Sequence, residues 1–487
     1  MSNRPPIASL ACLEPLEPRL LLTSDWTVMV FLDGDCNLEP QAIKYGFLEL
    51  ASVGSTPNVN VVVEFDRSNQ YSTEYGDWTD TRRGLVQKGD VPDTNWGVSI
   101  GEVNMGDPSV LAQFVNWAAA NYPADKYALV LDDHGSGLSV VSDEESNDCL
   151  WIGEVRTALN SASVGVDLLA MFACSMGTIE SAYEVAGNSS VYVACQGAAG
   201  VLGTNYLEIL TDLTAHPTYT ASQLGAEMVE LSFNNMSAID SSKMGALAAG
   251  LSSFCDIVMT KGTYADLQRL RTHRCTTSTA WYRISDMGTF LTLASEDGSI
   301  SATVRQAAAS ALLAFDGAMI AHKGHDGSGG LDFYYFPDPT AGAYPFYMNS
   351  SLKFLQDTLW DEFLLWWQSA PRAPSFYVDT IDSATGWTLE GDWGFGQPTG
   401  SMGDPSSGNT GTNVIGYNLE GGYGPMTTAE YAVLGPINCT GRTHVLLEYY
   451  RWLGVAQPPY GHASLQVSND GTNWSDFWTE QIVCAGS

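Results

Sequence analysis

The sequence predicts an α/β fold, an α/β/α sandwich with a mostly parallel sheet, followed by an all-β domain. Between residues 26 and 197, short apolar runs alternate with segments of helical spacing. Strands that are apolar on both faces and separated by helices indicate a parallel sheet covered on both sides. After the proline-rich stretch "APRAPS" (370–375), Gly, Ser, Thr, Asn and Trp become frequent and helical spacing disappears. The chain has 487 residues, more than the roughly 250–300 at which single cores stop growing.

The elements follow in order along the chain. The predicted strands are 26–35, 59–66, 126–135, 166–175 and 191–197, and the predicted helices are 38–54, 109–124, 153–162 and 178–187. From 205 to 370 helical spacing predominates, with one further strand expected at "GGLDFYYFP" (329–337). In the tail, 443–454 and 462–478 are expected to form strands, the second range being two strands joined by an Asn-Asp-Gly turn. We therefore expect a leader (1–24), an α/β domain (25–370) and a β domain (371–487).

Composition excludes several function classes. The chain has 21 Lys+Arg against 55 Asp+Glu, a formal net charge of −34, which repels nucleic acid and anionic membrane surfaces. Its 9 cysteines include no CxxC pair, which argues against a zinc ribbon or a thioredoxin-type site. No apolar run approaches the roughly 18 residues of a membrane span, and no metal site is expected from residue spacing.

The leader contains an unusual short motif. "LEPRLLLTS" (16–24) resembles the LEPR-x-LL-S element of exported planctomycete proteins. The resemblance implies export, and hence an extracellular or cell-surface location. A disordered leader without a role is the alternative.

Two reactive side chains end consecutive predicted strands. His134 lies in "LDDHGSG" (131–137) and Cys174 in "FACSMG" (172–177). The carboxyl ends of parallel strands form the ligand-binding edge of such a sheet, and an imidazole activates a nearby thiol. The N–H groups of Gly135 and Cys174 are candidate donors to an oxyanion. The helix expected at 178–187 should favour the thiolate through its dipole. Each residue alone could be structural, but their joint placement favours catalysis.

Several segments together carry a family resemblance. "WTVMVFLDGDCNLE", "YALVLDDHGSG", "VDLLAMFACSMGTIESAYEVAG" and "VYVACQGAAGVLGTNYLEIL" resemble, in order and spacing, the clostripain family of cysteine peptidases over about residues 25–340. The resemblance implies a caspase-like fold and the hydrolysis of protein or peptide substrates. It makes His134 the general base and acid and Cys174 the nucleophile of a thioester mechanism that requires no cofactor.

One position departs from the family pattern. The family commonly has an aspartate two residues before the nucleophile, where it binds a basic P1 side chain, and this chain has Phe172. Phenylalanine cannot form a charge-assisted pair, so we expect an apolar or small P1 residue. Phe172 and Gln196 are the predicted substrate-binding residues. A displaced acid, Asp167 or Glu208, is the alternative.

The acidic composition permits calcium binding, and some clostripain relatives depend on calcium. The sequence shows no identifiable set of calcium ligands. "DGDCNLE" (33–39) begins like an EF-hand loop, but Leu38 and Lys44 occupy the positions that require Gly and Glu. An EF-hand is therefore excluded.

The tail and the overall function leave alternatives open. Residues 376–487 resemble the MAM-like jelly-roll modules of secreted bacterial proteases, which implies a carbohydrate or protein ligand, although the aromatic residues could instead fill a β-sandwich. A catalytically inactive surface adhesion protein on a peptidase scaffold is the rival to the exported cysteine endopeptidase, and Phe172 is its best argument.

Overall fold

The structure is a computed structural model of the chain. It describes residues 23–200, 205–273, 284–324, 330–334, 345–348, 350–370, 375–401, 405–422, 428–442, 445, 447, 449–452 and 463–479. The motif at 16–24 therefore lies almost entirely outside the described residues. None of the described helices is long and apolar enough to cross a membrane.

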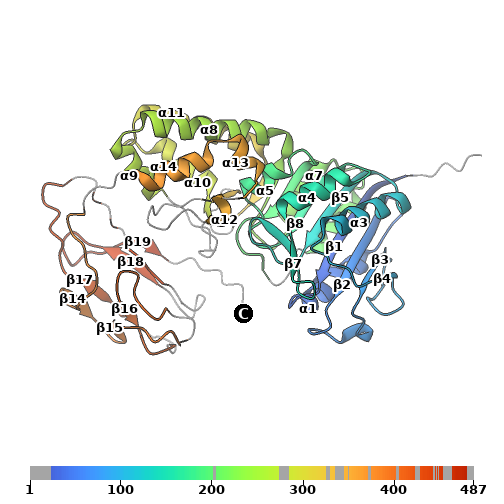
Figure 1. Ribbon diagram of the computed structural model, residues 1–487, viewed down its shortest axis with the longest axis horizontal. Helices are drawn as coiled ribbons and strands as arrows, with labels where there is room; N and C mark the ends of the chain where they lie inside the picture. Colours follow the sequence, from blue (N-terminus) through green and yellow to red (C-terminus); the bar gives the residue numbers. More distant parts are fainter. Residues whose placement is uncertain are drawn as a thin grey trace, which may run out of the picture.

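A nine-stranded sheet forms the centre of the α/β domain (Figure 1), in the order β12-β10-β9-β8-β5-β1-β2-β3-β4. The strands are β1 (Ser24–Gly34), β2 (Val59–Arg67), β3 (Thr81–Leu85), β4 (Val98–Gly101), β5 (Ala124–Asp132), β8 (Val166–Phe172), β9 (Ser189–Cys195), β10 (Met236–Asp240) and β12 (Met319–Lys323). The five strands from β9 to β2 run parallel to one another. The outer strands pair antiparallel. The predicted α/β class with a mostly parallel sheet is confirmed.

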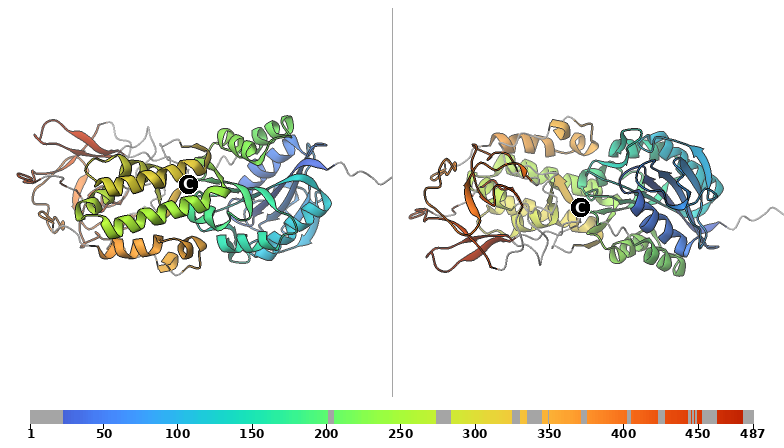
Figure 2. Two further views of the ribbon diagram at one scale, coloured as in Figure 1. Left: turned by 90° about the horizontal axis from the view of Figure 1, so that it is seen from above. Right: turned by 90° about the horizontal axis from the view of Figure 1, so that it is seen from below.

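Helices cover both faces of this sheet (Figure 2). On one face, Met29, Phe31 and Leu129 pack in a core shared with α3 (Pro108–Asn121), α4 (Ile152–Ser161) and α5 (Ile179–Glu184). On the other face, the alternate residues Val28, Val30 and Val130 share a second core with helices. These helices are the continuous segment α1 (Glu39–Gln41), η1 (Ala42–Phe47) and α2 (Leu48–Val53), together with α6 (Tyr206–Ala215) and α7 (Ala221–Leu231). Successive side chains of a strand point to opposite faces, which explains why the central strands are apolar throughout.

The chain from 241 to 370 is mainly helical, as expected. Its elements are η3 (Ser241–Lys243), α8 (Met244–Lys261), α9 (Tyr264–Thr272), α10 (Met287–Glu296), α11 (Ala302–Ala318), α12 (Pro345–Met348), α13 (Lys353–Asp357) and α14 (Trp360–Ser369). The strand expected at 329–337 is β13 (Asp332–Tyr334), which pairs with β11 (Ile284–Asp286) and not with the central sheet. Residues 329 and 335–337 of that prediction lie outside the described residues.

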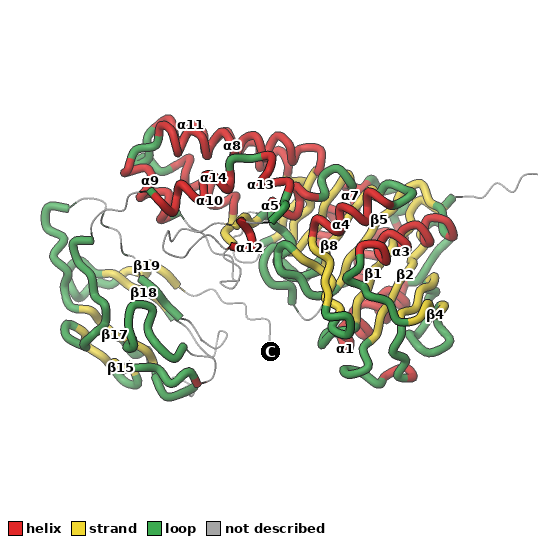
Figure 3. The backbone as a smooth tube through the Cα atoms, viewed as in Figure 1, coloured by secondary structure: helices red, strands yellow, loops and turns green. Residues whose placement is uncertain are grey.

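The described part of the tail contains short antiparallel strand pairs joined by loops (Figure 3). They are β14 (Trp387–Leu389) with β17 (Ala432–Leu434), β15 (Trp393–Gly396) with β16 (Val414–Tyr417), and β18 (Ser464–Val467) with β19 (Ser475–Thr479). The last pair confirms the two strands predicted within 462–478. The predicted strand 443–454 lies largely outside the described residues, and the jelly-roll module stays a prediction.

Candidate active site

The register of β5 and β8 places His134 and Cys174 side by side. Asp132 pairs with Phe172 at the ends of these parallel strands, and His134 and Cys174 each follow two residues later. Gly135 contacts the cysteine segment closely, because a Cβ atom at Gly135 would lie 2.5 Å from the carbonyl oxygen of Cys174. The two strand ends thus meet at the carboxyl edge of the sheet, where ligands bind in open α/β folds.

The imidazole of His134 is held by a residue from a third strand end. Asn37 follows β1, which neighbours β5 in the sheet, and its Oδ1 lies 2.7 Å from His134 Nε2. An amide oxygen only accepts hydrogen bonds, so the tautomer that satisfies this contact has its proton on Nε2 and leaves Nδ1 to accept one. Asn37 was not predicted as a site residue, although its position just after the strand expected at 26–35 could have indicated it.

The Cys174 thiol is partly exposed, and its Sγ accepts a hydrogen bond from the N–H of Ala199 at 3.3 Å. Burial raises the pKa of this thiol, and the hydrogen bond from Ala199 opposes the rise. The predicted lowering by a helix dipole is wrong. Helix α5 begins only at Ile179, and dipole effects fall off within the first turn. The thiol therefore needs a base to ionise it at neutral pH.

Asp133 lies buried beneath the histidine. Its carboxylate accepts hydrogen bonds from the Cys36 thiol at 3.0 Å and from the Ser142 N–H at 2.5 Å. Burial raises its pKa, and the charge of His134 is the largest opposing effect. Asp133 can therefore stabilise the imidazolium that forms when His134 takes a proton. Asp133 lies within "LDDHGSG", but no role was predicted for it from the sequence.

The turn after Cys174 is fastened to β9. Ser175 has φ +60°, in the left-handed region, and its N–H donates to the Gly197 carbonyl at 2.5 Å. The N–H of Gly177 donates to the Cys195 carbonyl at 2.7 Å. Such backbone conformations persist only where the surroundings enforce them. The sharp turn fixes the direction in which Cys174 leaves the sheet.

The sequence of this chain also matches a family of known proteins. The model of the clostripain family matches residues 30–367. The chain belongs to the clostripain family. Clostripain of Hathewaya histolytica is 34% identical over 189 residues, which are 32% of this chain and 35% of that protein. The match therefore spans about a third of the length of that curated relative.

Solved structures of the family share the fold. A secreted C11 cysteine protease from Bacteroides thetaiotaomicron, solved with an irreversible peptide inhibitor, has a TM-score of 0.52 at 18% identity, covering 69% of this chain and 99% of that chain. An inactive zymogen C11 protease from Parabacteroides distasonis has a TM-score of 0.48 at 17% identity, covering 69% of this chain and 98% of that chain. At 18% identity, the likeness to the Bacteroides thetaiotaomicron protease supports the caspase-like fold.

Phe172, where the family commonly has aspartate, is 4% exposed. Its ring packs edge-on against Tyr206 of α6, with ring centroids 5.4 Å apart. The Tyr206 hydroxyl donates to Asp132 Oδ2 at 2.7 Å. An acid therefore lies on the neighbouring strand, opposite Phe172 in the register. Burial raises the pKa of Asp132 to about 7, so its carboxyl group is only partly ionised at neutral pH.

The other residues considered for substrate binding lie elsewhere. Gln196 is 2% exposed, and its side chain bonds to Asp286, Asp332 and the Gly330 N–H. It thus joins β9 to the β11–β13 pair. Asp167 lies at the opposite end of β8 from Cys174 and accepts the Tyr127 N–H, so it cannot serve as a displaced acid. Glu208 is exposed on α6.

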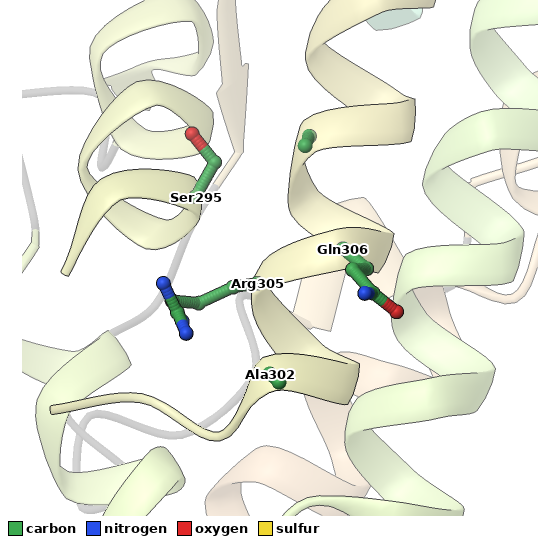
Figure 4. Close-up of a pocket in the computed structure, with 5 residues that line it drawn as sticks. Ser295, Ala302, Arg305 and Gln306 are labelled. Carbon is green, nitrogen blue, oxygen red and sulfur yellow. The ribbon is translucent and has the colours of Figure 1, made fainter. Parts of the chain in front are cut away.

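A shallow hollow between α10 and α11 is separate from this site (Figure 4). It is lined by Ser295, Ala302, Arg305, Gln306 and Ala309. None of these residues belongs to the strand ends that carry His134 and Cys174, and the lining contains no nucleophile paired with a base. The hollow therefore has no part in the proposed chemistry.

Helix α5, which follows the cysteine turn, contains a buried acid whose effect on stability can be measured. Glu180 is 0% exposed, and its Oε1 accepts hydrogen bonds from the Tyr334 N–H at 3.0 Å and the Tyr347 hydroxyl at 2.8 Å. Burial raises its pKa from 4.5 to about 7. The folded state therefore holds the proton more tightly than the unfolded state, and stability decreases as pH rises from about 4.5 to about 7.

Glu180→Gln should remove this pH dependence. We expect the variant to match the wild type near pH 5 and to exceed its unfolding free energy by about 2–4 kcal/mol at pH 8. Urea unfolding at the two pH values measures the difference. Glu208→Gln, at an exposed position, is the control and should follow the wild type. Parallel pH profiles for Glu180→Gln and the wild type would contradict the prediction.

Proposed function

We propose that this protein is an exported cysteine endopeptidase that hydrolyses peptide bonds through His134 and Cys174. The register of β5 and β8, which brings these two residues to one edge of the sheet, is the observation that carries the proposal. Membership of the clostripain family supports it. The "LEPRLLLTS" motif supports export, and the C-terminal β domain is an accessory binding module.

The mechanism uses groups of this chain alone. His134 takes the proton of the Cys174 thiol, and the thiolate attacks the scissile carbonyl. His134 then gives the proton to the leaving amine, which leaves a thioester on Cys174. A water molecule that is deprotonated by His134 hydrolyses the thioester and releases the second product. Asn37 orients the ring, and Asp133 stabilises its charged form.

The N–H groups of Gly135 and Cys174 suit the tetrahedral oxyanion. Within the described residues, neither group donates a hydrogen bond to a backbone carbonyl, and the Cys174 N–H faces its own Sγ. Gly135 bridges to Val140, but the bonds of that bridge run from Ser136 to Ser139 and from Val141 to His134. Two N–H donors beside the nucleophile that bond to no backbone carbonyl can provide the stabilisation that acyl transfer requires. A catalytically inactive adhesion protein would not need His134, Cys174 and these donors together. Their presence therefore argues against that alternative.

We further propose that the P1 residue is apolar or small. The Phe172 ring occupies the position that is commonly an acid in the family, and it is fixed by Tyr206. Asp132 is engaged by the Tyr206 hydroxyl, and an acid with a pKa of about 7 offers a basic P1 side chain less attraction than a fully ionised one.

Cleavage of a mixed-P1 peptide library tests this function, with product termini identified by mass spectrometry. Cutting should follow apolar or small residues and be absent with Cys174→Ala. Asp132→Asn should leave this preference unchanged. Cutting after Arg or Lys that is lost in Asp132→Asn would assign the displaced acid to Asp132 and overturn the assignment of Phe172. No cysteine-dependent cutting, with reductant present, would overturn the peptidase.

A further inference from the structure

The segment that follows β1 brings two neighbouring side chains to the surroundings of His134. Asn37 holds the imidazole, since its Oδ1 lies 2.7 Å from Nε2. The residue before it, Cys36, is 0% exposed, and its Sγ lies 3.0 Å from Asp133 Oδ1. The Cys36 Sγ, an Asp133 oxygen and a ring nitrogen of His134 all lie within 4.8 Å of one another. The mechanism proposed above uses His134, Asn37 and Asp133 but gives this buried thiol no role.

The Cys36 thiol is a hydrogen-bond donor in this arrangement. A carboxylate oxygen only accepts hydrogen bonds, so the S–H group donates to Asp133 Oδ1. The Leu38 N–H donates to the Cys36 Sγ at 3.4 Å, which fixes the sulfur from the other side. Burial, and in addition the charge of Asp133, raise the pKa of Cys36 far above its usual range. Cys36 therefore keeps its proton at neutral pH, and with no exposed surface it cannot act as a second nucleophile.

The Asp133 carboxylate lies among groups that repel its charge. Asp33 ends β1 beside it, Asp132 precedes it on β5, and the Cys174 thiol lies at the neighbouring strand end. Burial first, and the charge of Asp133 in addition, raise the pKa of all three groups. Asp133 itself is 5% exposed, and burial raises its pKa. The charged form of this carboxylate therefore depends on the hydrogen bonds and the positive charge that its surroundings supply.

Three hydrogen bonds and one charge oppose the effect of burial on Asp133. The charge is that of His134, when its ring is protonated, and two of the hydrogen bonds come from backbone N–H groups, those of Ser142 in β6 (Ser139–Asp143) and of His134. The third comes from the Cys36 thiol and is the one of the three that a side chain provides. A substitution can therefore remove the Cys36 hydrogen bond and leave the two backbone donors in place.

We propose that Cys36 is a positioning residue for catalysis, whose S–H group fixes the Asp133 carboxylate beneath His134 and favours its charged form. This inference rests on the proposed function of His134 as the base. A hydrogen bond to the charged form of a carboxyl group favours that form, and a charged carboxylate stabilises the imidazolium that forms when His134 takes the thiol proton. The segment after β1 thus acts on His134 twice, through the ring contact of Asn37 and through the carboxylate held by Cys36.

Cys36→Ala removes the donor and should change the pH dependence of hydrolysis. Without it Asp133 binds a proton more readily and attracts the imidazolium less, so the pKa of His134 should fall. The acid limb of kcat/KM, which reports the base of the free enzyme, should move to lower pH by about 0.5–1 pH unit. At the plateau kcat should fall about 5–20-fold, as expected for the loss of one hydrogen bond to a charged group, with KM little changed. Cys36→Ser keeps a donor at this position and should restore both quantities.

The pKa of His134 can also be measured without any hydrolysis. The sample is the full chain carrying Cys174→Ala, labelled at histidine Cε1 and titrated by NMR, and His134→Gln assigns the signal. Adding Cys36→Ala should lower the pKa of His134, and Cys36→Ser should return it toward that of the parent. Cys255→Ala is the matched control, because Cys255 is also a free cysteine with 0% exposure but lies on α8. It removes the same atom from a core and should leave the pKa of His134 unchanged.

The outcomes separate this inference from the peptidase function and from a purely structural role. An unchanged His134 pKa in Cys36→Ala, with a melting temperature lowered as in Cys255→Ala, would show that Cys36 only fills the core and would overturn the proposal. Failure of Cys36→Ser to restore the pKa would overturn it as well. If the wild type cleaves no peptide, the proposed function fails, whereas the titration still decides whether Cys36 acts on His134 through Asp133.

Discussion

Cys174→Ala should reduce peptide hydrolysis by about 10⁴–10⁶-fold, because removal of the nucleophile leaves only binding and oxyanion stabilisation. His134→Ala should lose a comparable factor, since residues that act as one unit are not additive. The double variant should therefore be scarcely worse than either single one. Measurement of kcat/KM on one library-selected peptide, for the three variants and the wild type, tests both statements.

The matched control is Cys439→Ala, because Cys439 is an exposed free cysteine in the loop after β17 and should not affect hydrolysis. Alkylation gives an independent readout. Burial raises the pKa of the Cys174 thiol, so its reaction with iodoacetamide in the free protein should accelerate as pH rises above neutrality. Retention of hydrolysis by Cys174→Ala, or its loss in Cys439→Ala, would contradict the assignment of the nucleophile.

Gly135→Ala adds only a methyl group, and we expect this small change to disrupt the candidate active site. Its Cβ would lie 2.5 Å from the Cys174 carbonyl oxygen and 2.9 Å from the Ala173 Cβ, so the two strand ends must separate. Displacements near 1 Å cost about 10²-fold in rate, and the shift would also move an oxyanion donor. We expect a loss of at least about 10²–10³-fold in kcat/KM and about 1–3 kcal/mol of stability.

Gly187→Ala is the control for that substitution, because an added Cβ there meets nothing within 4 Å. It should retain activity and melting temperature. Both quantities should be measured on the same preparations, so that lost activity can be compared with lost folding. Full activity in Gly135→Ala would show that the close approach of the strand ends is not required for catalysis.

The strand-end residues were predictable because they depend on local pattern. Apolar runs identified β5 and β8, and parallel strands in one sheet end at one edge, so His134 and Cys174 could be placed together. The cysteine turn was less predictable. Helical spacing from residue 178 predicted a helix close to the thiol, but α5 begins at Ile179 after a turn in which Ser175 is left-handed. The order of the tail strands was equally beyond a local pattern.

The sequence by itself determined the five parallel strands of the sheet, the positions of His134 and Cys174 just after two of them, and the family, because hydrophobic periodicity and short motifs are local properties. Only the tertiary structure decided which side chains surround the dyad. It turned Asn37 toward His134, placed Asp132 opposite Phe172 and engaged Gln196 in the interior. These contacts join residues tens of positions apart, such as Asp35 and Glu145. Their approach depends on strand order and loop packing, which one-dimensional patterns do not encode.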